Sequence, residues 1–330
     1  MAKRGQISTG LPILKRTAER FIASSDRRLG EGKFSLRGKM NDELGYVVYL
    51  DWNVIADLES GKLPKLEKKL FDLKNKNAIS IPFSSTHIKE ACNIESREEI
   101  NKRLAYISKL SSSLYFVNNL QSTGYRIETP KSVYDTISEV DLGFDTDKFI
   151  SNLIPYEALK YARNLLTLDP ARLNNILPEE AIDEIDKIIT SKEIKDRYWP
   201  DYEGDLSFRG LIKKTSEIVE QEALPPIFKD LYCQNKYIEL QNIIIMAFSL
   251  LDSLGFWPDK KEAYERASRF ADSMHAFNGA FANLVISADR RFCMKSKAVY
   301  SLLKRRPTVL HVKLDKDEIM KILDRLIDSS

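Results

Sequence analysis

Acidic side chains follow two apolar segments that lie far apart in the chain. Asp51 ends the run "YVVYLD" at residues 46–51, and Asp289 follows the run "NLVIS" at residues 283–287. Both runs are continuously apolar, which is typical of strands covered on both faces in a parallel sheet. A charge inside such a strand is costly, whereas at the carboxyl end it faces the crevice where open α/β sheets bind ligands. We therefore expect Asp51 and Asp289 to meet at one edge of a sheet.

Two more carboxylates are expected at the same edge. Glu90 lies one turn into the helix that follows the second predicted strand, "AISIPF", and Asp272 lies in the helix before "NLVIS". Right-handed crossovers would bring both helices to this edge. Four carboxylates in a small volume repel one another, and proteins usually resolve this by binding Mg²⁺ or Mn²⁺ through oxygen ligands. Such ions activate water and neutralise charge on phosphorus, so the expected chemistry is hydrolysis of a phosphodiester.

The order of elements predicts an α/β fold with a parallel sheet. Residues 46–95 read as strand, two helices, strand and helix, and an α/β rhythm returns after Trp257. The region between, residues 97–261, is mainly helical, with "LYFVNN" and "GYRIET" as candidate strands. We therefore predict an α/β domain formed by residues 45–96 and 262–330, a helical insertion at 97–261, and a peripheral basic segment at 1–44.

These residues together resemble the pattern of a PIN-domain nuclease. The resemblance rests on Asp51-x-Asn53 after the first strand, Glu90 after the second, Asp272 before a later strand, and Ser287-x-Asp289 at its end. It implies a parallel β-sheet sandwiched by helices and a metal-dependent nuclease. The four acidic residues would be metal ligands, while Asn53 and Ser287 would orient ligands or water. The 181 residues between Glu90 and Asp272 are more than compact members of the family have.

Other side chains near the acidic residues are candidates for contact with substrate. His87 lies three residues before Glu90 and His275 three after Asp272, so each shares a helical face with a carboxylate. Arg290 and Arg291 follow Asp289 directly and are able to clamp a phosphate. We expect all four, with Ser287, to bind substrate.

Each of these residues also has a structural interpretation. Asp51 or Asn53 would serve as the cap of the helix that starts there, and Asp289 as a turn carboxylate. Glu90 and Asp272 would be ordinary charges on helix surfaces. The histidines would pack and hydrogen-bond within the protein, and the two arginines would be solvated.

Composition limits the broad class of protein. Lys and Arg total 51 against 48 Asp and Glu, but the first 45 residues hold ten basic and five acidic side chains. This basic segment would bind a nucleic-acid backbone or remain a solvated tail. Three widely spaced cysteines favour a reducing compartment, and we expect a cytoplasmic protein without a membrane partner.

Three functions remain open at this point. The first is a nuclease that uses Mg²⁺ or Mn²⁺, with RNA favoured over DNA as substrate. The second is a noncatalytic nucleic-acid-binding or assembly module on the same fold. Whichever function holds, the helical insertion is a candidate surface for binding a second copy or a protein partner. The third is a haloacid-dehalogenase-like phosphatase, which Asn53 disfavours because such enzymes usually carry a second Asp at that position.

Overall fold

The computed structural model describes most of the chain. It covers residues 44–118, 123–139, 168–198, 200–201, 203–212, 237–259, 268–305 and 307–328, together with residues 160, 161, 163, 164 and 166. The predicted basic segment up to residue 43 lies outside the described residues, as do parts of the predicted insertion.

A four-stranded parallel sheet occupies the centre of the fold. Its strands are β1 (Tyr46–Leu50), β2 (Ile79–Ser80), β6 (Leu284–Ser287) and β7 (Thr308–His311), in the order β2-β1-β6-β7. β1 pairs in parallel with both β2 and β6, and β6 pairs in parallel with β7. The prediction of an α/β fold with a parallel sheet flanked by helices is therefore confirmed.

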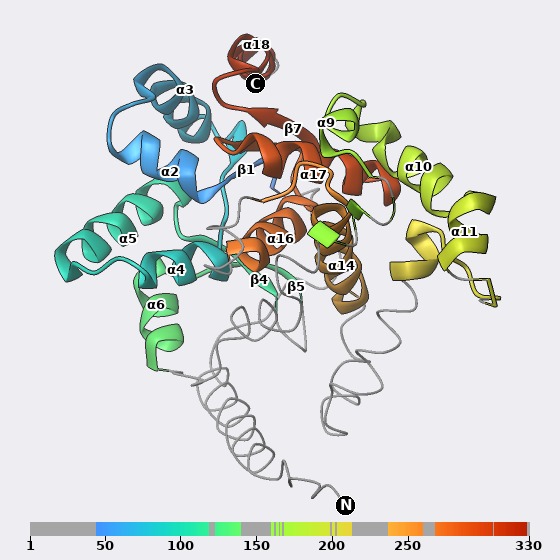
Figure 1. Cartoon of the computed structure of the whole chain (residues 1–330). Coiled ribbons are helices and arrows are strands. Elements are labelled where there is room, and N and C mark those ends of the chain that lie inside the picture. Colours follow the sequence, from blue (N-terminus) through green and yellow to red (C-terminus); the bar gives the residue numbers. More distant parts are fainter. Residues whose placement is uncertain are drawn as a thin grey trace, which may run out of the picture.

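Among the described residues, five helices from the first part of the chain and four from the last part pack around the two sheets. These are α2 (Trp52–Glu59), α3 (Pro64–Asn75), α4 (Ser85–Cys92), α5 (Arg97–Ser111), α6 (Pro130–Glu139), α14 (Ile238–Leu254), α16 (Ser268–Gly279), α17 (Arg290–Leu302) and α18 (Lys316–Asp328). Three other helices, α9 (Pro170–Leu173), α10 (Pro178–Ile189) and α11 (Lys192–Tyr198), lie on the side of the molecule away from α2 and α3 (Figure 1).

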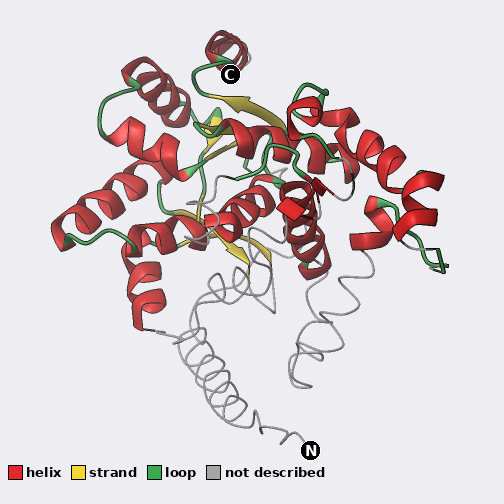
Figure 2. Ribbon diagram, in the orientation of Figure 1, coloured by secondary structure: helices red, strands yellow, loops and turns green. Residues whose placement is uncertain are grey.

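The two faces of β1 belong to two different hydrophobic clusters. Val47 and Tyr49 pack into a cluster with α10, α14, α16 and α17, whereas Val48 and Leu50 pack into a cluster with α2, α3, α5 and α18. Each face of the sheet is thus covered by helices, and the strands lie inside a helical shell (Figure 2). This burial explains why the strands read as continuous apolar runs.

The second predicted strand differs from the expectation. "AISIPF" is divided into β2 and β3 (Phe83–Ser84), and β3 belongs to a separate three-stranded sheet with β4 (Leu114–Asn118) and β5 (Thr123–Ile127). Pro82 has no N–H to donate to a strand ladder, so the pairing is interrupted there. β4 pairs in parallel with β3 and antiparallel with β5.

The candidate strands of the predicted insertion are therefore part of the structure. Leu114 and Phe116 of β4 join one hydrophobic cluster, and Tyr115 and Val117 join the other. The small sheet thus separates the same two clusters as the large sheet. The division into an α/β domain and an insertion stays a prediction.

Leucines at two positions provide a test of where the stability comes from. Leu284 in β6 is fully buried, whereas Leu314 is 62% exposed. We expect Leu284→Ala to lower the free energy of unfolding by about 3 kcal/mol because it leaves a cavity in the cluster that contains Val48 and Leu50. Leu314→Ala should change it by less than about 0.5 kcal/mol. Chemical denaturation monitored by circular dichroism measures both, and equal losses would contradict the assignment of β6 to the core.

Candidate acidic site at the sheet edge

Asp51 and Asp289 lie at the carboxyl ends of neighbouring parallel strands. The register pairs Leu50 of β1 with Ile286 of β6, and Asp51 donates its N–H to the carbonyl of Ile286 at 3.0 Å. Ser287 connects the two acids, since its Oγ donates to Asp51 Oδ2 at 2.7 Å and accepts from the N–H of Asp289 at 2.9 Å. The structure thus brings together two carboxylates that are far apart in the sequence.

Each of these two carboxylates also caps a helix. Asp51 Oδ1 accepts from the N–H of Trp52 at 2.8 Å, at the start of α2. Asp289 Oδ1 accepts from the N–H groups of Arg291 and Phe292 at 2.6 and 3.2 Å, at the start of α17. A carboxylate has about four lone-pair sites, so capping leaves oxygen lone pairs available. The partial positive charge of a helix N-terminus also attracts a negatively charged side chain.

Glu90 is held by a buried histidine. Its Oε2 lies 2.7 Å from His275 Nε2, and the same nitrogen lies 3.9 Å from Asp51 Oδ1. Burial alone lowers the pKa of His275, but Glu90, together with Asp51 and Asp272, raises it to about 9. His275 is therefore an imidazolium cation at neutral pH, and it lies among three of the four predicted metal ligands.

A chain of hydrogen bonds connects His275 to the end of β1. His275 Nδ1 lies 2.7 Å from Tyr49 Oη, which lies 3.1 Å from Ser84 Oγ. Ser84 contacts His87 Nδ1 through its N–H at 3.0 Å and its Oγ at 3.1 Å. His87 Nε2 completes the chain at 2.8 Å from the carbonyl oxygen of Leu50.

Both histidines belong to this buried scaffold. His87 and His275 are at most 1% exposed, and both ring nitrogens of each are hydrogen-bonded. Burial lowers the pKa of His87 well below its ordinary value, and the charge of His275 lowers it further. His87 is therefore neutral and donates from Nε2 to Leu50. In this arrangement neither histidine offers a free nitrogen to a substrate phosphate.

Asp272 on α16 is coupled to the other acids. Burial raises the pKa of its carboxyl well above the ordinary value; Lys295 opposes this rise, while Asp259, Asp51 and Asp289 add to it. Asp272 thus shares an electrostatic environment with the two strand-end acids. Because part of its surface is still exposed, it lies at the boundary between the site and solvent.

Lys295 is a functional candidate that sequence reasoning missed. Lys295 is 1% exposed, and its ammonium donates to Asp259 Oδ1 at 3.0 Å and lies 3.8 Å from Asp252 Oδ1. Burial lowers its pKa, but the carboxylates of Asp259, Asp252 and Asp272 outweigh this and raise it, so Lys295 is charged. The sequence does indicate that Lys295 is buried, because its spacing places it on the same helical face as the apolar residues Phe292 and Val299.

The oxygen donors of the site are of the kind that a divalent metal ion binds. The described side chains are not, however, arranged around a common point where an ion would sit. Carboxylate oxygens are the donors that Mg²⁺ and Mn²⁺ prefer. Within the described part of the chain, however, no group of three or more His, Cys, Asp or Glu side chains is arranged to hold a metal ion. Glu90 is turned toward His275, while Asp51 and Asp289 point their oxygens at helix N-termini and at Ser287.

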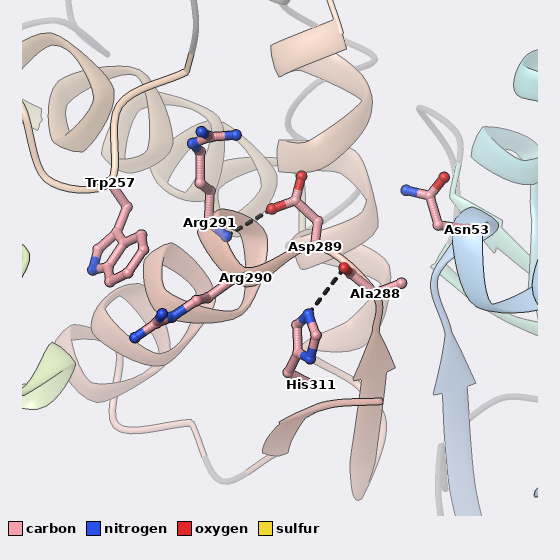
Figure 3. A pocket seen from close by; sticks show the side chains of 7 residues that line it. All are labelled: Asn53, Trp257, Ala288, Asp289, Arg290, Arg291 and His311. Carbon is pink, nitrogen blue, oxygen red and sulfur yellow. Dashed lines mark hydrogen bonds between the residues drawn. The ribbon is translucent and has the colours of Figure 1, made fainter. Parts of the chain in front are cut away.

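A cleft of about 420 Å³ opens beside Asp289. It is lined by Asn53, Trp257, Asp289, Arg290, Arg291 and His311, which Figure 3 shows around Asp289. Four of the predicted site residues, namely Asn53, Asp289, Arg290 and Arg291, thus line one cleft. Trp257 and His311 are additions that the sequence did not indicate. His311 Nε2 donates to the carbonyl of Ala288 at 3.0 Å, because its Nδ1 accepts from the N–H groups of Lys313 and Leu314.

Comparison with protein-family models, with curated proteins and with solved structures finds none that matches this chain. The resemblance to PIN-domain nucleases therefore stays a prediction. In the part of the chain that the structure describes, none of the helices has the length and apolar character needed to cross a membrane.

The charge of His275 predicts a specific pH dependence of stability. The pKa is about 9 in the folded protein against an ordinary value of 6.5. The resulting stabilisation, about 3 kcal/mol, is fully present below pH 6.5 and is lost as the pH rises through 9. We expect the free energy of unfolding to decrease over this range in the wild type and to change much less in His275→Gln. Urea unfolding with a chelator measures this, and parallel profiles for the two proteins would contradict an imidazolium at this position.

The buried ammonium of Lys295 gives a second stability prediction. Lys295→Met leaves Asp259 and Asp252 without their buried cation, and we expect the free energy of unfolding to fall by about 3 kcal/mol at neutral pH. The added change Asp259→Asn should restore part of this loss because it removes the uncompensated charge. The exposed Lys316→Met is the matched control. Equal effects at the two lysines would show that Lys295 does not neutralise the acids.

Proposed function

We propose that this protein is a metal-dependent nuclease of the PIN type that hydrolyses phosphodiester bonds in nucleic acid, with RNA favoured over DNA. The observation that carries the proposal is the meeting of Asp51 and Asp289 at the ends of adjacent parallel strands, joined by Ser287. This edge of an open α/β sheet is where such folds usually bind their ligands.

The residues around these two acids support a phosphodiester substrate. Arg290 and Arg291 lie on the cleft beside Asp289, and guanidinium groups match phosphate oxygens with two parallel hydrogen bonds. Asn53 lies across the cleft from Asp289 (Figure 3) and would orient the attacking water or a phosphate oxygen. The cleft thus combines an acid for the reaction centre with cations for the substrate.

Asp51, Asp272 and Asp289 would hold the Mg²⁺ or Mn²⁺ ion. When bound, the ion would supply Lewis-acid chemistry, polarising the phosphate and lowering the pKa of water. Ser287 keeps the carboxylate of Asp51 directed to the site by donating to Oδ2. Glu90 accepts from His275, so this predicted ligand would have to turn away from the imidazolium to join the other three.

A noncatalytic nucleic-acid-binding module on the same fold is the second candidate. The observation that favours it is the arrangement of the acids, since no three of the described ligand-type side chains are grouped to hold an ion. In that case His275 and Lys295 would serve only to neutralise buried carboxylates, and the arginines of the cleft would carry the binding.

Cleavage of labelled nucleic acid tests the proposal. We expect the full-length protein to cut single-stranded RNA, and DNA more slowly, with Mg²⁺ or Mn²⁺ and not with chelator. Asp51→Asn and Asp289→Asn should each lower the rate at least about 100-fold, because each removes a charge at the reaction centre. Asparagine is chosen because it preserves helix capping. The exposed Asp317→Asn is the matched control and should keep full activity.

Four outcomes would decide against the metal-dependent nuclease. Cleavage that survives the chelator, or activity unchanged in both Asp variants, would overturn the mechanism. Binding without cleavage of any substrate would favour the module. Release of free phosphate from small monoesters would favour a phosphatase instead.

A further inference from the structure

Trp257 and Arg290 form one wall of the cleft beside Asp289. The guanidinium carbon of Arg290 lies 4.6 Å from the centre of the Trp257 ring, within the range of a cation–π contact. In Figure 3 the two side chains lie together, with the side chain of Arg291 above them and Asp289 to their right. A guanidinium that packs its flat face on an aromatic ring keeps its N–H groups, which lie in its plane, free to donate.

The two arginines of the cleft have no acidic partner in the described parts of the chain. Arg290 makes the contact with Trp257, and Arg291 donates its backbone N–H to Asp289, but neither guanidinium forms an ion pair there. Other arginines of this protein form ion pairs with acidic side chains: Arg103 pairs with Glu59, and Arg172 pairs with Glu184. Two positive charges on one cleft are therefore available to an anion.

Trp257 is held in a strained conformation. Its φ is 47°, in the left-handed region that bulky residues rarely adopt, and its N–H donates to Asn174 Oδ1 at 2.6 Å. The fully buried Phe256 anchors the preceding position, and its N–H donates to the carbonyl of Leu251. The indole Nε1 is buried and has no hydrogen-bond partner in the described residues. Strain of this kind persists only where the surrounding structure holds the residue in place.

We propose that this cleft is a subsite for one nucleotide of a single-stranded nucleic acid, next to the phosphodiester at Asp289. Arg290 binds the flanking phosphate, and Trp257 is a positioning residue that holds the guanidinium in place. A cleft of about 420 Å³ is of the size that takes a single small ligand, whereas a duplex is too bulky to enter it. The position of the nucleotide relative to a scissile bond rests on the proposed function; the binding itself does not.

Binding measured without cleavage tests the subsite. Full-length protein in chelator is titrated against fluorescein-labelled single-stranded RNA and DNA of about 12 nucleotides, and against a duplex of the same length, by fluorescence anisotropy. We expect Arg290→Ala to weaken single-strand binding about tenfold and to lower the salt dependence by about one phosphate contact. Trp257→Leu should weaken it several-fold, while Trp257→Phe keeps an aromatic face and restores most of the affinity.

Arg305 provides the matched control. It lies beyond the other end of α17, and its guanidinium carbon is 5.8 Å from the ring centre of Phe281, so Arg305→Ala removes the same charge and a similar contact. We expect it to leave single-strand binding within about twofold of the wild type. Melting followed by circular dichroism verifies that every variant is folded.

The outcomes separate this inference from the nuclease proposal. Single-strand binding by Arg290→Ala and by Trp257→Leu that equals binding by Arg305→Ala would overturn the subsite. Duplex binding as tight as single-strand binding, and equally sensitive to Arg290→Ala, would overturn its selectivity for single strands. Selective single-strand binding without any cleavage would support the subsite and contradict the nuclease proposal. Cleavage with a KM that Arg290→Ala leaves unchanged would support the nuclease proposal and contradict the subsite.

Discussion

Neutralisation of buried negative charge is the constraint on which this structure depends. Carboxylates gathered at the edge of a covered sheet are costly unless each has a cation, a dipole or a hydrogen-bond donor. The chain supplies all three kinds of partner: His275 for Glu90, Lys295 for Asp259, and helix N-termini for Asp51 and Asp289. The acidic site is therefore stable as folded, and a divalent ion would enter a region where protein cations already balance part of the charge.

The sheet makes this arrangement possible by joining the two ends of the chain. β1 and β6 are neighbours although Asp51 and Ser287, which hydrogen-bond to each other, are 236 positions apart. The chain of hydrogen bonds from Glu90 through His275, Tyr49 and Ser84 to His87 then links α16 to α4 and to β1. Because β3 belongs to the small sheet and β1 to the large one, the same chain of hydrogen bonds joins the two sheets.

The sequence predicts the frame of the site better than its details. The apolar runs that end at Asp51 and Asp289 are visible because both faces of β1 and β6 are buried, and burial on both faces leaves a continuous hydrophobic pattern.

The details that the sequence does not predict depend on contacts between distant elements. They include the division of the second strand at Pro82, the pairing of Glu90 with His275 and the buried cation of Lys295. Local patterns carry little information about such contacts, although a lysine on the apolar face of α17 was a usable sign. The sequence did not indicate Trp257 as a residue of the cleft. Its position depends on its left-handed backbone conformation and on the contact with Arg290, and neither can be recognised from local sequence patterns.

The capping role of Asp51 and Asp289 affects how relatives of this protein should be interpreted. Because both aspartates cap helices, selection for a folded protein would preserve them even in a lineage that had lost its activity. Arg290 is exposed and contributes little to the core, so a folded but inactive descendant would be free to replace it. Among homologues, the joint retention of Arg290 and Trp257 would therefore be a better marker of the proposed nucleotide subsite than the acids themselves.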